Sequence, residues 1–574
     1  MKINLKDIPF SMACSYAVIS ELPENYRKSL NQEGLFLRTV RGGAKSTLIS
    51  RLVPVEQEQE TAYTYEATES EIVIKTKSGE LRLCFADEQT ILICGQKGGP
   101  GLRLEFVPAL PYFDYLHKVP CEQGQCYQVN CFGQNVKYLM WAQQGTAVMQ
   151  QTWDGCVAGE NQILFDGQNE PLLAVIREIS SEWDGVLRTY DYAAGRTAAA
   201  QKFEAFCRRM PEVPERYADT GRLAAYVDWS SIVGRNGFLT RDGMLMSKNW
   251  MCSVWSWDHC FNAVALSYKN PAEAWNQWMI PFDWQDPTGR IPDRINNYEV
   301  DFSYCKPPVH GWALSRMMKV MELSALQMAE AYDKLEKWTE WWLNYRDYDR
   351  NGLCEYTHGY DSGWDNATAF REMPVVALPD LQTYLILQME TLAELAEKLN
   401  RKKTADIWQK RSDKMLAAML EHCFEDGQPV GTESKRVQKS ESLIYYIAVM
   451  LAHRLPEEIR RNLVETLKSD KFLTPNGFAT ESPASTAYEA DGYWRGPIWA
   501  PSTLLLLDGL KACGEDEFVT QAAEAFCLMV QEHGFAENFN AITGEGLRDL
   551  AYTWTPSVFL TLAHDYLKEH THCE

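Results

Sequence analysis

The chain has 574 residues, which is more than one ordinary hydrophobic core accommodates and predicts two or more domains. Hydrophobic residues make up 45% of it and charged residues 23%, which is typical of a soluble globular protein. The formal net charge of −22 excludes nucleic acid and anionic membranes as expected partners, because both require a basic face.

The N-terminal stretch "MKINLKDIPF" contains no apolar run long enough for a signal peptide, and no later stretch is apolar enough to span a bilayer. The 16 cysteines include no Cys-x-x-Cys pair, so we expect reduced thiols and a cytoplasmic protein. The spacing of Cys121, Cys126 and Cys131 does not match a zinc site, and the tail "HTHCE" is typical of a frayed terminus. We therefore predict no metal and no cofactor, while the oligomeric state stays open.

Residues 1–190 are predicted to form a β-sandwich domain. The stretch "SEIVIKTKSGELRLCFADEQTILICGQ" alternates apolar and polar residues, and "KSGE" is typical of a hairpin turn. The stretches "NVKYLMWAQQGTAVMQQTW" and "EPLLAVIREI" continue the same pattern. Short strands separated by frequent turns favour an antiparallel sandwich, and no chemical motif stands out in it.

Helical periodicity replaces this pattern in the rest of the chain. Residues 191–235 are interpreted as a linker with the first helices, and residues 236–574 as a catalytic domain. Residues 311–349 contain one or two long helices, and three helix pairs with short joins follow: 380–400 with 402–424, 441–455 with 456–469, and 496–513 with 516–534. A last helix begins at residue 555, and we expect roughly a dozen helices with no strand between them.

The joins alternate between short and long, with long segments at 281–309, 347–379, 423–438, 470–496 and 533–554. Long loops rich in Trp, Asp and Gly are usually functional rather than disordered. Helical hairpins whose long loops share one end predict an all-α (α/α)6 toroid with a mouth formed by those loops.

The long segments share flat aromatic rings, acids, arginines and amides, which suit a sugar. Aromatic rings stack on the C–H face of a pyranose, and its hydroxyl edge needs fixed polar partners. The candidates are Trp255, Trp257, Asp258, Trp284, Arg290, Asp293, Arg294, Asp361, Trp364, Asp365, Trp494, Arg495, Trp499, Glu537, Asn538 and Asn540.

Two carboxylates in these segments fit the cleavage of a glycosidic bond. Asp365 directly follows Trp364, whose indole would exclude water and raise the pKa of a general acid. Glu537 is the candidate base that activates water. Helix capping is the alternative for Asp365 and Asp258, and a structural role is the ordinary expectation for His259 and His310.

Four motifs resemble glycoside hydrolase family 63, in the right order over roughly residues 250–560. "SGWDNAT" resembles the Gly-Trp-Asp signature that this family shares with trehalases, and "AENFNAITGEG" resembles its Glu-Asn-Tyr-Asn-Pro-x-Thr-Gly motif. "GYWRGPIWAPS" and "WSWDHCFNAVAL" resemble its Tyr-Trp-Arg-Gly-Pro-x-Trp segment and its Trp-Asp helix entry. The resemblance implies an (α/α)6 barrel, often preceded by a β-sandwich.

The resemblance also implies an inverting, exo-acting α-glycosidase with Asp365 as acid and Glu537 as base. We predict an α-glucosidase that acts on a small oligosaccharide or glycoside, while the motifs leave glucose or mannose, and the linkage, open. The resemblance implies that Trp257, Asp258, Arg294, Trp364, Trp494 and Arg495 hold the terminal sugar. The trehalase motifs are replaced by "LMSKNWMCSVWSWD" and "YWRGPIWAP", which counts against trehalose, and Phe539 and Ala541 stand where the family has Tyr and Pro.

Three alternatives stay open at this point. The same toroid hosts sugar epimerases and isomerases, which use histidines for proton transfer and would depend on His259 and His310. It also hosts glycoside phosphorylases, in which phosphate replaces the activated water and Glu537 has no role. A non-catalytic protein would bind sugars without consuming them.

Overall fold

The computed structural model describes residues 1–22, 33–43, 45–110, 112–121, 124–179, 181, 183–434 and 436–568, so the tail "HTHCE" lies outside the described residues. Contacts divide the chain into two compact units. One comprises Met1–Arg208, Ala225–Ser253 and Asn296–Glu299, and the other comprises Arg209–Ala224, Val254–Ile295 and Val300–Glu574. The domain boundaries at residues 190 and 235 stay a prediction.

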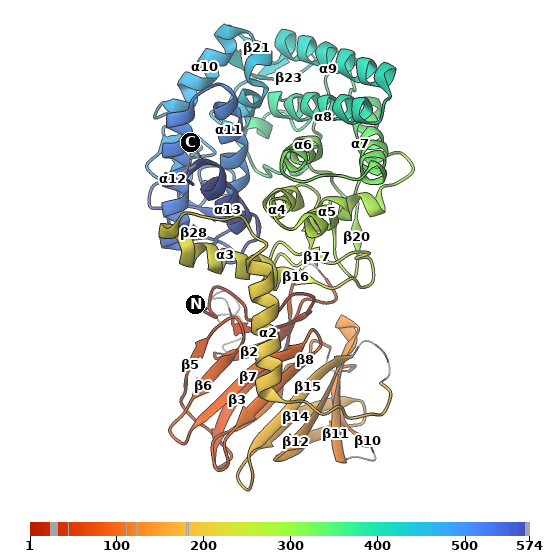
Figure 1. Cartoon of the computed structure of the whole chain (residues 1–574), viewed down its shortest axis with the longest axis vertical. Helices are drawn as coiled ribbons and strands as arrows, with labels where there is room; N and C mark the ends of the chain where they lie inside the picture. The colour runs from red at the N-terminus through yellow and green to blue at the C-terminus, as the bar shows by residue number, and fades with distance from the viewer. Residues whose placement is uncertain are drawn as a thin grey trace, which may run out of the picture. The chain divides into compact units, whose positions relative to one another are not determined.

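Two antiparallel sheets build the first unit (Figure 1). The first sheet has the order β1 (Ala17–Glu21), β2 (Leu35–Thr39), β3 (Thr47–Glu56), β9 (Gly101–Phe106), β14 (Val157–Asp166), β13 (Thr146–Asp154), with β4 (Gln59–Glu60) paired to β3. The second has the order β10 (Tyr115–Cys121), β11 (Gly124–Cys131), β12 (Val136–Gln144), β15 (Leu172–Ile179), β8 (Thr90–Gly95), β7 (Glu80–Asp87), β6 (Ile72–Lys75), β5 (Thr64–Ala67). The predicted antiparallel N-terminal region is confirmed, including the hairpin at "KSGE" that joins β6 and β7.

The centre of the second sheet is buried on both faces, because most residues of β8 and β15 are buried, whereas β5 and β10 keep exposed residues. One face carries an apolar cluster that includes Leu92, Trp141 and Val175, and Trp183 and Tyr190 pack on it. Burial of such apolar area is the main term that stabilises the fold.

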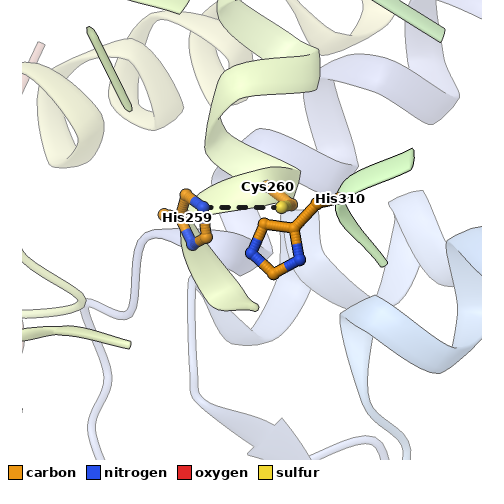
Figure 2. Close-up of side chains that lie close together, drawn as sticks. All are labelled: His259, Cys260 and His310. Atoms are coloured by element: carbon orange, nitrogen blue, oxygen red, sulfur yellow. Dashed lines mark hydrogen bonds between the residues drawn. The ribbon is translucent and has the colours of Figure 1, made fainter. Parts of the chain in front are cut away.

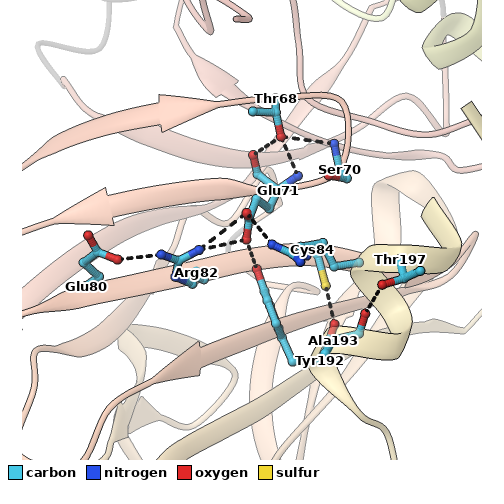
Figure 3. A network of polar contacts seen from close by, with 10 residues as sticks. Thr68, Ser70, Glu71, Glu80, Arg82, Cys84, Tyr192, Ala193 and Thr197 are labelled. Atoms are coloured by element: carbon cyan, nitrogen blue, oxygen red, sulfur yellow. Dashed lines mark hydrogen bonds and ion pairs between the residues drawn. The ribbon is translucent and has the colours of Figure 1, made fainter. Parts of the chain in front are cut away.

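Helix α2 (Tyr192–Cys207) packs against β7 and is fixed to the second sheet by the carboxylate of Glu71 (Figure 3). That carboxylate accepts a hydrogen bond of 3.1 Å from the Tyr192 hydroxyl and one of 3.0 Å from Arg196, and pairs with Arg82 at 3.4 Å. Asp191 caps the helix by accepting from the Ala194 amide. Helix α2 therefore begins directly after its cap, within the region 191–235 that is predicted to hold the first helices.

The second unit is mainly helical, as predicted. Its helices are α4 (Asp258–Ser267), α5 (Pro271–Met279), η3 (Ile280–Trp284), α6 (His310–Val320), α7 (Ala325–Tyr345), η4 (Gly359–Ser362), η5 (Thr368–Phe370), α8 (Pro379–Lys398), α9 (Lys402–His422), η6 (Leu443–Arg454), α10 (Glu457–Lys468), α11 (Ala500–Ala512), α12 (Asp516–His533) and α13 (Trp554–Tyr566). The segment 311–349 forms two helices, and Ser324 and Gln327 form a capping box at the start of α7.

Within the described residues, six of these helices pack in a closed order: α4 on α6, α6 on α8, α8 on η6, η6 on α11, α11 on α13, and α13 back on α4 (Figure 1). The joins that leave these helices are short, and the segments that enter them are long, as the sequence predicts. We call these six helices the inner helices. The long loops therefore lead into their N-terminal ends.

Short antiparallel ladders lie in the long loops, so the prediction of no strand between the helices is wrong. The ladders are β16 (Ile232–Val233) with β17 (Gly243–Met244); β18 (Val254–Trp255), β19 (Arg294–Ile295) and β20 (Val300–Asp301); β21 (Phe424–Glu425) with β22 (Gln428–Pro429); β23 (Gly431–Glu433) with β24 (Arg436–Gln438); β25 (Leu473–Thr474) with β26 (Gly477–Phe478); and β27 (Asn538–Phe539) with β28 (Gly546–Leu547). Loops that are buried must pair their backbone polar groups, and these ladders do so.

The remaining elements are η1 (Phe132–Gln134), η2 (Glu215–Tyr217) and α3 (Ala218–Ser231). Among the described residues, no helix is both long enough and apolar enough to span a bilayer.

Candidate active site

The long loops of the helical unit are joined to one another by backbone hydrogen bonds. Ile498 and Phe539 exchange two of them, at 2.7 and 3.0 Å, which ties the "GPIWA" segment to the "AENFN" segment. Ala377 and Thr432 exchange another two, at 2.8 and 3.0 Å. The motifs that are distant in sequence are thus brought to one end of the inner helices.

Asp365 lies in the loop between α7 and α8, just after the short helix η4. Gly363 makes the turn in the left-handed conformation, with φ of 73°. A Cβ atom at this residue would lie 2.6 Å from the Trp257 ring, so the close approach requires glycine. Asn366, the residue after Asp365, anchors the loop by two side-chain hydrogen bonds. Its amide donates to the Gly492 carbonyl (3.0 Å), and its oxygen accepts from the Trp494 amide (2.9 Å).

The Asp365 carboxyl is half-buried and lines a cavity of about 340 Å³, together with Arg371 and Arg495. Burial raises its pKa from 3.8 to about 7; the nearby Lys306 ammonium opposes this shift and the Asp293 carboxylate adds to it. An acid that keeps its proton at neutral pH beside a cavity can donate that proton to a bound ligand.

Lys306 is a buried cation close to the carboxyl groups of Asp293, Asp365 and Asp258. It is 6% exposed, and its ammonium lies 3.1 Å from Asp293 and donates to the Tyr360 carbonyl at 2.7 Å. Asp293, Asp365 and Asp258 all favour its charged form and raise its pKa. One buried ammonium thus balances part of a cluster of three acids.

Asp258 is the first residue of α4 and is 2% exposed. Burial raises its pKa to about 7, although Tyr552 donates a hydrogen bond of 2.9 Å to its carboxylate and stabilises the charged form. Its carboxyl also hydrogen-bonds its own backbone at the first position of α4, so Asp258 contacts both its helix and the loop that carries Tyr552.

Glu537 precedes β27, at the start of a short hairpin. Its amide donates to the Asp549 carbonyl at 2.7 Å, and its carbonyl accepts from the Trp554 indole at 3.0 Å, so its backbone is fixed on both sides. The carboxyl is 5% exposed. Burial raises its pKa to about 8; the Asp549 carboxylate adds to the shift, while Arg548 and a hydrogen bond with Tyr493 oppose it.

Tyr493 connects the acid and base candidates. It hydrogen-bonds Glu537, and after burial the largest influences that raise its pKa are Glu537, Asp365 and Asp258, in that order. Its backbone has φ of 64°, which is rare and strained for a tyrosine. Its neighbour Trp494 is bonded to Asn366, so a continuous path of contacts runs from Asp365 to Glu537.

Four of the predicted tryptophans form a packed cluster within these loops. Trp494 and Trp499 stack in parallel with centroids 3.9 Å apart, and Trp364 lies 4.6 Å from Trp494 on a tilted plane. Trp257 approaches Trp494 at 6.0 Å, and none of the four exceeds 2% exposure. Their stacking with a sugar stays a prediction, whereas their packing against one another gives the site a rigid floor.

The other predicted binding residues differ in how far their polar groups are already engaged. Asp361 accepts from Arg346, the Cys305 amide and Thr357, so the contacts favour a structural role. Arg294 pairs with Asp301 at 3.1 Å across β19 and β20. Asn540 accepts from the Ile542 and Thr543 amides and shapes the hairpin turn, whereas Arg495 pairs with Glu489 at 2.7 Å and still reaches the Asp365 cavity.

Sequence reasoning missed Lys306, Tyr493 and Tyr552. Lys306 precedes two prolines inside a predicted long loop, and Tyr493 precedes the Trp-Arg pair, so both stood within segments already identified. A search for cations near the predicted acids could have found Lys306. Nothing in the sequence indicated that Tyr552 reaches Asp258, because the two residues are far apart in the chain.

Comparisons with known proteins find similar proteins among the glycoside hydrolases. A family model described as the mannosylglycerate hydrolase MGH1-like glycoside hydrolase domain matches residues 251–555, which is more than half of the chain. A mannosylglycerate hydrolase from Rubrobacter radiotolerans is 22% identical over 400 residues, covering 53% of this chain and 89% of the relative. A glucosylglycerate hydrolase from Mycolicibacterium hassiacum is 22% identical over 405 residues, covering 54% and 91%.

Solved structures show the same fold. A bacterial glucoamylase complexed with acarbose matches with a TM-score of 0.63 and 10% identity, covering 98% of this chain and 95% of that chain. A GH63 mannosylglycerate hydrolase from Thermus thermophilus, in complex with Tris and D-glycerate, matches with a TM-score of 0.52 and 16% identity, covering 59% and 98%. The glucoamylase match extends over both units, and the GH63 match covers a smaller part of the chain.

Proposed function

The chain belongs to the mannosylglycerate hydrolase MGH1-like family of glycoside hydrolases, within glycoside hydrolase family 63, and on that premise we propose that it is an inverting, exo-acting α-glycosidase. The closed order of the inner helices is, in this proposal, an (α/α)6 toroid with its substrate site among the long loops. The path of contacts from Asp365 through Asn366, Trp494 and Tyr493 to Glu537 is the observation that carries it.

Asp365 acts as the general acid. Its pKa of about 7 keeps a substantial protonated fraction near neutral pH, and it lines a cavity that a leaving group can enter. As the glycosidic bond breaks, the carboxyl proton passes to the leaving oxygen, and Asp365 becomes a carboxylate beside Lys306. The ammonium then stabilises the charge that appears there.

Glu537 acts as the general base. Its carboxylate takes a proton from a water molecule, whose oxygen attacks the anomeric carbon from the face opposite the leaving group, so the α-glycoside gives a β-anomer. The hydrogen bond from Tyr493 stabilises the ionised form that this step needs. Asp258, Asp365 and Glu537 each raise the pKa of the same tyrosine, so all three carboxyl groups lie near its hydroxyl.

The terminal sugar, in this proposal, lies against Asp258 and the tryptophan cluster, with Arg294, Asp361, Asn540 and Arg495 around it. The relatives are named for mannosylglycerate and glucosylglycerate, and one neighbour was solved with D-glycerate. Arg371 and Arg495 beside Asp365 suit a small anionic aglycone of that kind. We keep an α-glucoside as the first substrate to test, and an α-mannoside as the second.

The alternatives have less support. His259 and His310 are 0% exposed, so a proton transfer to a sugar by either ring would need the fold to open. A phosphorylase would leave Glu537 without a role, although its carboxyl is held in the site by Tyr493.

An NMR time course tests the proposal. Glucosylglycerate, mannosylglycerate and the matched neutral glucosyl- and mannosylglycerols are each incubated with the enzyme, and the anomer that forms first is recorded before mutarotation. We expect the β-anomer and no acceleration by added phosphate. A first-formed α-anomer would contradict inversion, and a sugar 1-phosphate product would replace hydrolysis by phosphorolysis.

A further inference from the structure

A group of three metal-binding side chains lies between the starts of α4 and α6. Figure 2 shows His259 and Cys260 from α4 and His310 from α6 close together, with their side chains directed to a common space. Their donor atoms all lie within 4.8 Å of one another, and each residue is 0% exposed. No other such group occurs among the residues that the structure describes, including around Cys121, Cys126 and Cys131.

His259 is held in the form that binds a metal. Its Nδ1 lies 3.0 Å from the Trp255 carbonyl, so this nitrogen carries the proton and donates it. Its Nε2 lies 3.6 Å from the sulfur of Cys260, and the Trp278 backbone is a second group close to the ring. A backbone carbonyl that orients the second nitrogen is the usual support of a metal-binding histidine.

His310 lacks the partners that a buried imidazole normally has. Neither of its ring nitrogens makes a hydrogen bond with the described residues, and its nearest rings are His259 and Phe282, each 5.2 Å away between centroids. The Ser256 backbone is near enough to affect its pKa, but without the geometry of a hydrogen bond. Leaving such a group unsatisfied destabilises the fold, so a buried polar atom of this kind calls for a bound water or ion. His310 thus points to a ligand independently of the His259–Cys260 pair.

We propose that His259 Nε2, Cys260 Sγ and one ring nitrogen of His310 bind a zinc-type metal ion that joins the first turns of α4 and α6. Two imidazoles and one thiolate are a donor set that zinc accepts, with a fourth position for water. The complete burial of all three side chains favours a structural role over a catalytic one. The proposal does not depend on the hydrolase reaction, since it concerns metal content.

Binding a divalent metal ion would change the charge of this buried group of side chains. On binding, the Cys260 thiol releases one proton to solvent, and its sulfur becomes a thiolate ligand. The third position of a helix favours this negative charge, because the helix N-terminus carries a partial positive charge. With two neutral imidazoles and one thiolate, the bound divalent ion keeps a net charge of +1.

Elemental analysis of the full chain, purified without chelator or affinity metal, tests the proposal. We expect about one zinc per chain, retained through dialysis against a weak chelator. After removal by a strong chelator, cobalt chloride should restore one ion per chain with the near-ultraviolet absorption of a cobalt–thiolate bond. Cys260→Ser should abolish that absorption, while Cys527→Ser, which changes another fully buried cysteine of the helical unit, should keep it.

His310→Gln adds a variant that keeps the cysteine and should lower cobalt affinity at least tenfold, as loss of one ligand does. The wild-type measurements remain decisive if a variant fails to fold. The proposal is overturned if the wild type holds no metal and binds no cobalt, if the bound metal is unaffected by Cys260→Ser, or if Cys527→Ser loses it equally.

Discussion

The loop between α7 and α8 holds two aspartates in opposite environments, only four residues apart. Asp361 is enclosed by Arg346, Thr357 and the Cys305 amide, and these partners lower its pKa despite its burial. Asp365 has no such enclosure, and burial raises its pKa to about 7. The same side chain is thus fixed as an anion in one place and kept as an acid in the other.

This difference separates a residue that holds the loop from a candidate catalytic residue within the same motif. Four hydrogen bonds use the acceptor capacity of Asp361, so this residue holds the loop. Asp365 borders a cavity and has few protein partners, so its proton is available. Conversion of either residue to asparagine should therefore affect different measurements.

The largest effect is expected for Asp365→Asn, which cannot donate a proton. We expect kcat/KM to fall about 10³-fold for a glycoside with a poor leaving group, because general acid catalysis contributes on that scale. With an α-glycosyl fluoride, whose leaving group needs little protonation, the loss should shrink at least tenfold. Steady-state kinetics on both substrates measures this.

Glu537→Gln is the matched control for that measurement, because a lost base affects both substrates. Equal losses for Asp365→Asn on the two substrates would remove its assignment as the acid. Activity at the wild-type level in either variant would remove the catalytic pair.

Asp361→Asn should act on stability rather than on chemistry. It leaves the Arg346 guanidinium, which is 8% exposed, without its anionic partner, and breaking a buried pair of this kind costs about 3 kcal/mol. Chemical denaturation should show this loss, while kcat per folded molecule stays within about threefold. A normal stability with a large rise in KM would instead support the predicted contact with sugar.

The sequence was sufficient for the order of elements and for the alternation of short and long joins. Periodicity separates strands from helices, and Trp-, Asp- and Gly-rich loops stand out by composition, so Asp365 and Glu537 could be identified as candidates. Tyr552 could not, because its importance depends on which loops meet. The short ladders were missed for the same reason, since two-residue strands such as Asn538–Phe539 have no pattern of their own.

The tryptophans illustrate a further limit. Composition predicts aromatic rings near a sugar, but it cannot separate a ring that faces the ligand from one that faces another ring. Trp494 stacks on Trp499 at 3.9 Å, a contact set by the turn at Tyr493 and the bond to Asn366. Such packing is a property of the folded loops.

Glu537→Gln should stabilise the protein at alkaline pH. The folded state raises the pKa of this carboxyl from 4.5 to about 8, so ionisation opposes folding increasingly as the pH rises from 4.5 to 8. Removing the charge should add about 2 kcal/mol to the free energy of unfolding at pH 9 and close to nothing at pH 4. This value is discounted from the 1.36 kcal/mol that corresponds to each pKa unit. Thermal unfolding at the two pH values measures it, and an equal shift at both would contradict the cause.

The smallest effect concerns the cation that faces Asp365. The wild-type profile of kcat/KM against pH should be bell-shaped with its maximum between about 7 and 8, because Asp365 must be protonated and Glu537 ionised. Lys306 lowers the pKa of Asp365, so Lys306→Met should move the descending alkaline limb of log kcat/KM upward in pH by about one unit. The sign follows because an acid with a higher pKa keeps its proton to a higher pH.

Lys306→Arg is the control, since it keeps the positive charge near Asp293 and should leave the alkaline limb within about 0.3 unit of the wild type. The acid limb, which reports Glu537, should move less than the alkaline limb in Lys306→Met, because the charged groups that shift the pKa of Glu537 are Asp549, Arg548 and Asp258 rather than Lys306. A downward shift, or the same shift in the arginine variant, would mean that Lys306 holds the loop by its bond to the Tyr360 carbonyl and does not set the proton affinity of Asp365.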